Sequence, residues 1–71
     1  MNNLFENTMN QQILKHLSEG LTIKEIAVKV FLSKRAVENR IRKMKGEASA
    51  QTGIQIRNNI QLVAHANSLT L

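Results

Sequence analysis

The stretch TIKEIAVKVFLSKRAVENRIRKMK, residues 22–45, predicts two helices in close succession. Thr22 and Glu25 match a capping box, in which the Thr hydroxyl accepts from the third helical amide and the Glu carboxylate accepts from the Thr amide. A helix over about residues 23–30 should follow, with apolar side chains at helical spacing. These side chains are Ile23, Ile26, Ala27 and Val30. The first part of the stretch therefore predicts a short helix with one buried face.

Ser33 is a second start signal, because its hydroxyl can accept from an amide in the first turn of a helix. Only Phe31 and Leu32 separate it from the preceding helix. Two residues leave room for a tight turn and nothing longer. We expect their apolar side chains to seal the core.

The helix that opens at Ser33 has one narrow apolar face, and its other faces are almost entirely basic or polar. The apolar face consists of Val37, Ile41, Met44 and Ala48. We expect the helix to continue past Gly46 to about Gln51, because an interior Gly costs only about 1 kcal/mol relative to Ala. Gly53 is a better stop, since Gly tolerates the positive φ of a helix end.

Two further helices flank this pair. Asn7 is a predicted N-cap for a helix over about residues 8–18, and Gly20 ends it. The residues before it, 1–6, read as a loose lead-in. The apolar stripe of the helix over residues 8–18 is Met9, Ile13, Leu14 and Leu17.

The last helix should begin near residue 58 or 59 and run to about residue 67, and it has two apolar sides. The side that we expect to cover the core is Ile60, Val63, Ala64 and Asn67. The side that we expect to face a partner includes Leu62 and Ala66. The chain is thus predicted to be one all-α domain of four helices over residues 1–71.

The positive charge of the chain is concentrated on one predicted helix. Six of the ten Lys and Arg residues fall between Lys34 and Lys45, where Glu38 is the only acid. This segment therefore carries a net charge of +5, equal to that of the whole chain. A neutral body with one cationic helix is the electrostatic footprint of a protein that binds duplex DNA.

The composition excludes several other classes. The absence of Cys excludes disulfides and thiolate metal sites. Two aromatic residues are too few to stack the bases of a single strand. No catalytic triad, paired carboxylate site or phosphate loop can be assembled, so we expect no enzyme activity and no cofactor. Since neither a signal peptide nor a membrane span is present, we expect a cytoplasmic protein that does not bind membranes.

Two helices joined by a tight turn, the second with a basic exposed face, are typical of a helix-turn-helix. The segments SEGLTIKEIA, residues 18–27, and FLSKRAVEN, residues 31–39, resemble the LuxR/FixJ/NarL-type helix-turn-helix. The resemblance covers about residues 9–44 without a gap. It implies a four-helix transcription factor domain that binds double-stranded DNA, often the output half of a two-component response regulator. If the chain is a fragment, a receiver or sensor domain would lie upstream.

The apolar face of the third helix should turn four side chains outward, and Arg and Asn are the types that pair with guanine and adenine edges. The predicted base-contacting residues are Glu38, Asn39, Arg42 and Arg35. Together with the charge pattern, the resemblance implies that phosphates are contacted by Lys24, Ser33, Lys34, Arg40, Lys43 and Lys45. The fourth helix of that family makes the dimer contact, which implies a homodimer seam at Leu62 and Ala66. Where the family has an Arg-Glu pair early in the first helix, this chain has Met9 and Asn10.

Several alternatives remain open at this level. Glu38 could accept from a cytosine amino group or pair with Arg42 at i, i+4 and orient it. Asn39 could read adenine or be a plain surface residue. The domain as a whole could be a protein-interaction module on a helix-turn-helix scaffold, or a membrane-surface binder. The last is disfavoured, because Val37, Ile41 and Met44 are needed by the core.

Overall fold

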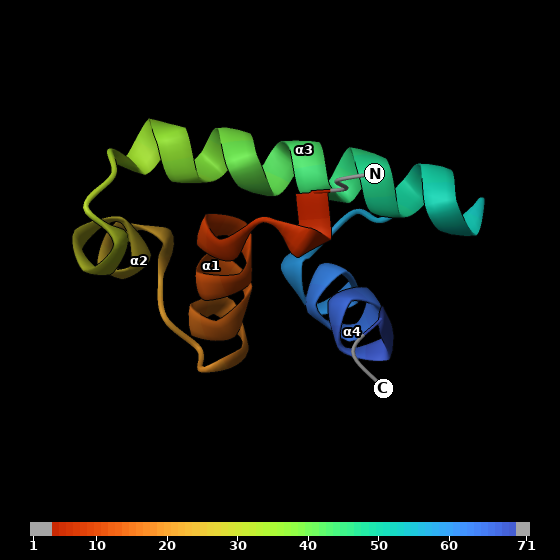
Figure 1. The fold of residues 1–71 in the computed structure, drawn as a ribbon, viewed down its shortest axis with the longest axis horizontal. Coiled ribbons are helices and arrows are strands. Elements are labelled where there is room, and N and C mark those ends of the chain that lie inside the picture. Colours follow the sequence, from red (N-terminus) through yellow and green to blue (C-terminus); the bar gives the residue numbers. More distant parts are fainter. Residues whose placement is uncertain (1–3, 70–71) are drawn as a thin grey trace.

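The computed structural model describes residues 4–69, and it contains four α-helices and one 3-10 turn. The elements are η1 (Leu4–Glu6), α1 (Thr8–Ser18), α2 (Ile23–Val30), α3 (Lys34–Thr52) and α4 (Asn59–Leu69). Figure 1 shows α3 running the length of the molecule, with α1, α2 and α4 all on one side of it. No strand occurs in this range. The predicted all-α, four-helix fold is confirmed.

The helices begin where local side chains can accept from free amides. Asn7 Oδ1 accepts from the amide of Asn10 at 3.1 Å, and Ser33 Oγ accepts from the amide of Ala36 at 3.1 Å. At the start of α2 both halves of the capping box form: Thr22 Oγ1 accepts from the Glu25 amide, and Glu25 Oε1 accepts from the Thr22 amide at 2.9 Å. All three predicted N-caps are therefore confirmed.

The end of α3 is set by Gly53, which adopts a φ of 71° and donates its amide to the Ser49 carbonyl at 2.9 Å. The helix therefore passes through Gly46 and ends at Thr52, as predicted. The connector that follows is tied back to it, because Ser49 Oγ accepts from the Ile56 amide at 2.9 Å. This bond fixes where the chain turns toward α4.

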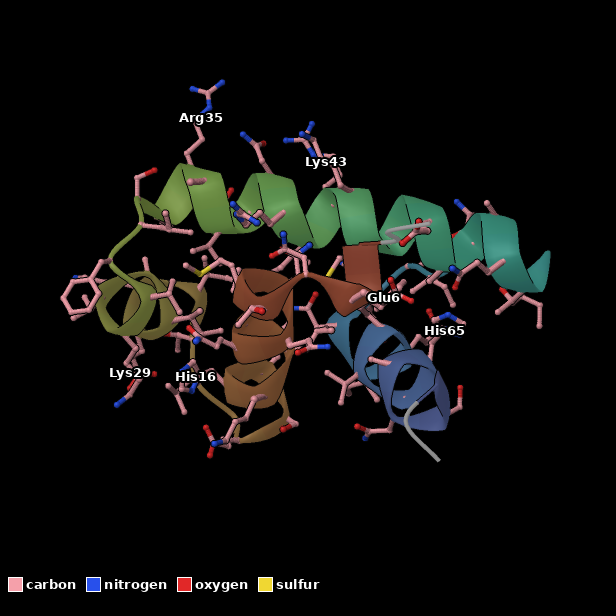
Figure 2. All side chains as sticks on the ribbon, viewed as in Figure 1. Glu6, His16, Lys29, Arg35, Lys43 and His65 are labelled. Atoms are coloured by element: carbon pink, nitrogen blue, oxygen red, sulfur yellow. The ribbon has the colours of Figure 1, made fainter. Side chains whose placement is uncertain are left out.

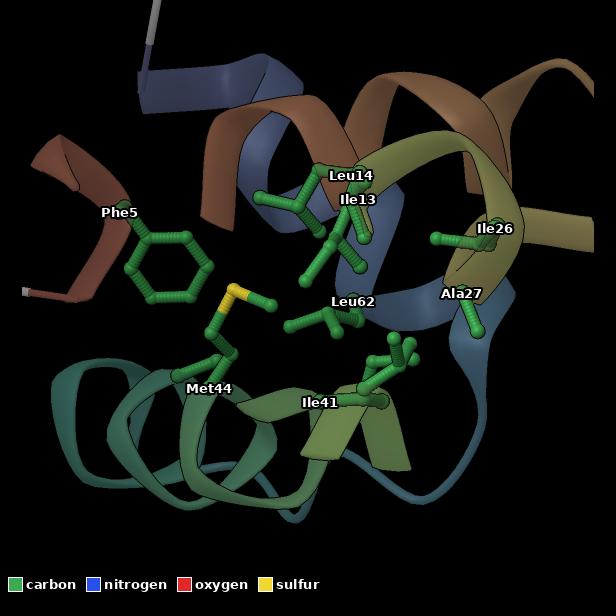
Figure 3. Packing of buried hydrophobic residues seen from close by; sticks show 11 residues of the cluster. Phe5, Ile13, Leu14, Ile26, Ala27, Ile41, Met44 and Leu62 are labelled. Atoms are coloured by element: carbon green, nitrogen blue, oxygen red, sulfur yellow. The ribbon is translucent and has the colours of Figure 1, made fainter. Parts of the chain in front are cut away.

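Every element contributes to one apolar core (Figure 3). Its buried members are Phe5, Ile13, Leu14, Ile26, Ala27, Val30, Val37, Ile41, Met44, Ala48 and Leu62. The predicted apolar faces of α1, α2 and α3 all point into it. Since α3 contributes four of these side chains along one line, its opposite face is left to solvent over several turns.

The N-terminal segment differs from the loose lead-in expected over residues 1–6. Residues 1–3 lie outside the described range, but η1 is ordered and Phe5 is only 7% exposed. The Gln11 side chain holds η1 against α1 by donating to the Phe5 carbonyl at 3.1 Å. A single aromatic ring that reaches the core is enough to anchor the segment, because it buries a large apolar area.

The expected orientation of α4 was wrong. Leu62, predicted to face a partner, is fully buried, whereas Ile60, predicted to face the core, is 82% exposed. Ala66 packs partly buried against the core on the same side as Leu62. Asn58 caps the start of α4, where its Oδ1 accepts from the Gln61 amide at 2.8 Å. A helix with apolar residues on two sides can bury only one of them against the core, and here the side that includes Leu62 and Ala66 turns inward.

The turn between α2 and α3 also corrects one expectation. Leu32 packs partly buried against the core, as predicted, but Phe31 is 93% exposed. Phe31 has a φ of 57°, and the next amide, that of Leu32, donates to the Ala27 carbonyl at 3.0 Å. This is a Schellman-type end, in which the residue after the left-handed one turns inward. The geometry therefore buries Leu32 and leaves Phe31 outside.

Candidate nucleic-acid interface

The exposed face of α3 gathers most of the predicted contact residues. At about 100° per residue, one line along this face runs opposite the buried line. It consists of Arg35, Asn39, Arg42 and Gly46, all exposed. The exposed Glu38 and Lys34 flank this line on one side, together with the half-buried Lys45, and Lys43 flanks it on the other. Figure 2 shows Arg35 and Lys43 projecting from α3 on the side away from the other helices.

Within this face, Arg42 is held by its neighbour Asn39. Arg42 Nη2 donates to Asn39 Oδ1 at 2.7 Å. The alternative, an i, i+4 ion pair between Glu38 and Arg42, does not form among the residues that the structure describes. Glu38 therefore keeps its carboxylate exposed beside the pair. The amide of Asn39 orients the guanidinium and still has both N–H groups to donate.

Arg40 is placed differently from the other cations. It is half-buried, and its Nη1 donates to Asn10 Oδ1 at 3.0 Å, linking α3 to α1. Asn10 itself is only 3% exposed. A neutral amide at the position where the resembled family has a charged pair therefore still makes a bond between helices. Among the five cations predicted to contact phosphates, Arg40 is the one that the structure also bonds to another helix.

Ser33 and Lys24 lie at the N-terminal ends of their helices. Ser33 Oγ is engaged as the cap of α3, where it accepts from the Ala36 amide. A hydroxyl that accepts one bond still has its own proton to donate. Lys24 is exposed in the first turn of α2. Both groups therefore stay available to an anionic partner.

The capping box beside Lys24 has an electrostatic consequence. The hydrogen bonds from the Thr22 backbone and side chain favour the carboxylate of Glu25 and lower its pKa below the ordinary value, and the charge of Lys29 acts in the same direction. Glu25 is thus ionised whenever the domain is near neutral pH, and its charge serves the start of α2.

A groove of about 310 Å³ runs beside the exposed face of α3. It is lined by Ile23, Glu38, Ile41, Arg42, Lys45 and Asn59. Asn59 Oδ1 is buried without a hydrogen-bond partner in the described part of the chain. No sequence signal assigns Ile23 or Asn59 to the interface, because only the packing of α2, α3 and α4 brings them beside Arg42.

Two predicted residues lie away from this face. Leu62 and Ala66 pack into the core and therefore do not form the exposed seam that was expected of them. The apolar side chains exposed near the start of α4 are instead Ile54 and Ile60.

Other kinds of site find no support in the described residues. Among them, no three His, Asp or Glu side chains are grouped so that they could hold a metal ion. None of the helices between residues 4 and 69 has both the length and the apolar character needed to cross a membrane.

Comparison with known families gives one match. A family model for winged helix-turn-helix DNA-binding domains matches residues 6–47, which is more than half of the chain and includes α1, α2 and most of α3. Neither a curated protein nor a solved structure gives a significant match. The matched segment ends before α4, and residues 48–69 contain the end of α3, a connector and α4, with no strand among them.

Proposed function

This chain belongs to the winged helix-turn-helix DNA-binding family, and on that premise we propose that it is a sequence-specific regulator of transcription that places α3 in the major groove of double-stranded DNA. In a helix-turn-helix the second helix enters the major groove while the first crosses the backbone. The observation that carries the proposal is the line of Arg35, Asn39 and Arg42, which is exposed along α3 in the part of the chain that the structure describes.

The base contacts are assigned to the centre of this face. Arg35 and Arg42 suit guanine O6 and N7, and Asn39 suits adenine N6 and N7. Glu38, with its carboxylate exposed at the edge of the groove, can accept from a cytosine amino group. Because Asn39 orients Arg42, the two side chains are expected to read adjacent bases as a unit.

The phosphate contacts are assigned to the flanks and the helix ends. Lys34, Lys43 and Lys45 border the central line on both sides and can reach the two strands that wall a major groove. Lys24 and the Ser33 hydroxyl add contacts at the starts of α2 and α3. Arg40 donates one of its N–H groups to Asn10. A guanidinium has five N–H donors, so the rest can still serve a phosphate.

Within the helix-turn-helix proteins, the LuxR/FixJ/NarL type is the subclass that we favour. The support is the ungapped register of the capping box, the short turn and the start of α3. The proposal that two copies pair on DNA, and that a receiver or sensor domain lies upstream in a longer protein, depends on this subclass. Pairing through α4 would have to use the exposed Ile54 and Ile60, because Leu62 is buried.

A salt titration of binding to duplex DNA tests the proposal. The purified chain is first used to select duplexes from a random pool, and the affinity for the selected duplex is then measured by fluorescence anisotropy. The logarithm of the affinity should fall linearly with the logarithm of the salt concentration, with a slope of about −4.5 for five phosphates contacted by Lys or Arg. Selected and scrambled duplexes should differ in affinity by a factor of about 10³ or more.

A matched pair of variants controls for net charge. Lys34→Ala removes a cation from the face of α3, and Lys15→Ala removes one from the exposed surface of α1. Only Lys34→Ala should reduce the salt slope. If both variants act alike, or if the selection enriches no sequence, specific DNA reading by α3 is refuted. A chain that binds no DNA at all would favour the alternative, a protein-interaction module on a helix-turn-helix scaffold.

A further inference from the structure

Phe31, in the turn between α2 and α3, has an unusual combination of conformation and exposure. Its ring is 93% exposed, and it is the most exposed of the large hydrophobic side chains that the structure describes. It is also the only described non-Gly residue with a positive φ, at 57°. A bulky side chain in this conformation is a genuine outlier, since Gly or Asn would adopt it at lower cost. Neither packing nor helix termination explains why the turn contains a Phe.

The charges around Phe31 indicate what kind of partner would cover it. The segment from Ile26 to Val37 contains three cations, Lys29, Lys34 and Arg35, and no acid. The positive end of the α3 dipole at Ser33 is offset by the negative end of the α2 dipole, which lies at Phe31 itself, so the positive charge here comes from these three side chains. A partner for this ring must therefore be anionic overall and yet offer an apolar group. Duplex DNA meets both conditions, because each thymine places a methyl group in the major groove.

The position of Phe31 along the chain places it at the correct end of α3. It precedes the N-cap, Ser33, by two residues. In helix-turn-helix complexes the residues at the N-terminal end of the recognition helix contact base edges. Val28, one helical turn earlier, is 71% exposed and adds a second apolar side chain at this end of the molecule. In the proposed complex the exposed ring thus lies at the end of α3 that enters the groove.

We propose that Phe31 is a specificity-determining residue that packs on the C5-methyl group of a thymine at the edge of the bound site. The proposal rests on the function proposed above, in which α3 enters the major groove. In this proposal, the left-handed backbone conformation of Phe31 holds the ring outside the core, while the next residue, Leu32, packs against the core. Phe31 would add a preference for thymine to the hydrogen-bonding code of Arg35, Asn39 and Arg42.

Replacement of single thymines by uracil tests this proposal, because uracil lacks only the methyl group. Each thymine of the selected duplex is replaced in turn by deoxyuridine, and the affinities of the wild-type chain and of Phe31→Ala are measured on every probe. For the wild-type chain one replacement near an end of the site should weaken binding about fourfold, the factor expected for burial of one methyl group. For Phe31→Ala the same replacement should have no effect, and the unmodified duplex should bind more weakly.

Two further variants make the result interpretable. Phe31→Gly removes the ring and suits the positive φ, so it should keep the fold, as judged by circular dichroism, and should lose the uracil effect as Phe31→Ala does. Gln12→Ala removes an exposed neutral side chain from α1, outside the proposed interface, and should leave every affinity and every uracil effect unchanged.

The outcomes separate this proposal from the function on which it rests. A wild-type chain that binds no duplex refutes the proposed function itself. A chain that binds DNA but shows no uracil effect, or the same effect in Phe31→Ala, refutes only the thymine contact. Equal weakening of all probes by Phe31→Ala would assign the ring to the sugar-phosphate backbone and also overturn the thymine contact. Unchanged binding by Phe31→Ala would show that the ring contacts no DNA, would favour a protein partner for it, and would also overturn the thymine contact.

Discussion

Arg42 and Asn39 form one unit on the open face of α3, joined by a 2.7 Å hydrogen bond from Arg42 Nη2 to Asn39 Oδ1. An exposed Arg ordinarily samples many rotamers, and ordering it on a ligand costs free energy. In the proposed complex the bond would reduce this cost, because the guanidinium is already oriented before DNA binds. It also ties together the two side chains that best suit guanine and adenine edges.

Arg42→Ala should therefore relax the sequence preference of the domain, whereas Lys34→Ala should weaken all sequences alike. Loss of a bidentate base contact costs about 1–3 kcal/mol of discrimination. Loss of a phosphate contact instead reduces the salt slope by about 1. Competition between the selected duplex and its single-base variants measures the first effect, and salt titration measures the second. Equal loss of specific and non-specific binding in Arg42→Ala would make Arg42 a backbone clamp.

Leu62→Ala should unfold a large share of the domain. Leu62 is fully buried, and truncation of a buried Leu costs about 2–5 kcal/mol. A chain of 71 residues has little more stability than that to lose. Ile60→Ala is the matched control, because Ile60 is 82% exposed and should change stability by less than about 0.5 kcal/mol. Urea denaturation of both variants measures the difference, and equal stabilities would contradict the inward orientation of Leu62.

The helices were predictable because their limits depend on neighbouring residues. Asn7, Thr22 and Ser33 each satisfy an amide three residues on, and Gly53 adopts the positive φ that ends α3. The orientation of α4 was not predictable, because a helix with apolar residues on two sides can turn either one inward. The choice depends on how α4 packs against α1 and α3, and no residue within α4 signals that packing.

The candidate interface was predictable in part for the same reason. The apolar stripe of α3 fixes which side chains point outward, so Arg35, Asn39 and Arg42 follow from periodicity alone. The bond from Arg40 to Asn10 does not, because it joins residues thirty apart and has no local signal. The exposure of Phe31 also does not follow from periodicity. Phe31 and Leu32 are both apolar, and only the backbone conformation of the turn decides which of them packs against the core.

Asn10→Ala should destabilise the domain by about 1–3 kcal/mol, because it removes a buried hydrogen-bonding partner of a half-buried guanidinium. Arg40→Ala should lower the free energy of unfolding by a similar amount. The double variant should lose less than the sum of the two single losses, since both changes break the same hydrogen bond. Thermal denaturation of the four proteins in this cycle gives the coupling. Strict additivity would mean that the bond contributes nothing to the link between α1 and α3.

Glu25→Gln should lower stability near neutral pH, and the deficit should shrink in acid. The pKa of Glu25 is lowered in the folded state by its bonds with Thr22, so the carboxylate contributes stability above the ordinary Glu pKa. That contribution is lost as the pH falls through the lowered value. Gln keeps the capping-box bond but has no charge to titrate. Urea denaturation from neutral pH into the acid range measures the change, with Glu38→Gln on α3 as the control for net charge.

Gly46→Ala separates helix stability from DNA contact at one position. Gly46 lies in the middle of α3 with a helical backbone, and beyond its own helical turn an added Cβ would meet no atom within 4 Å. Ala should therefore raise the free energy of unfolding by about 1 kcal/mol, the difference in helix propensity. Gly46 also continues the exposed line of Arg35, Asn39 and Arg42, so in the proposed complex it lies against the groove. If DNA approaches α3 closely there, the same variant should bind the selected duplex more weakly although it is more stable.

Ala50→Gly, further along the exposed surface of α3, is the converse control for Gly46→Ala. It should lower stability and leave the affinity per folded molecule unchanged, because it weakens the helix beyond the expected contact. Denaturation and anisotropy on the same preparations give both quantities. A Gly46→Ala variant that is more stable and binds as before would place the end of the DNA contact before Gly46, within the first three turns of α3.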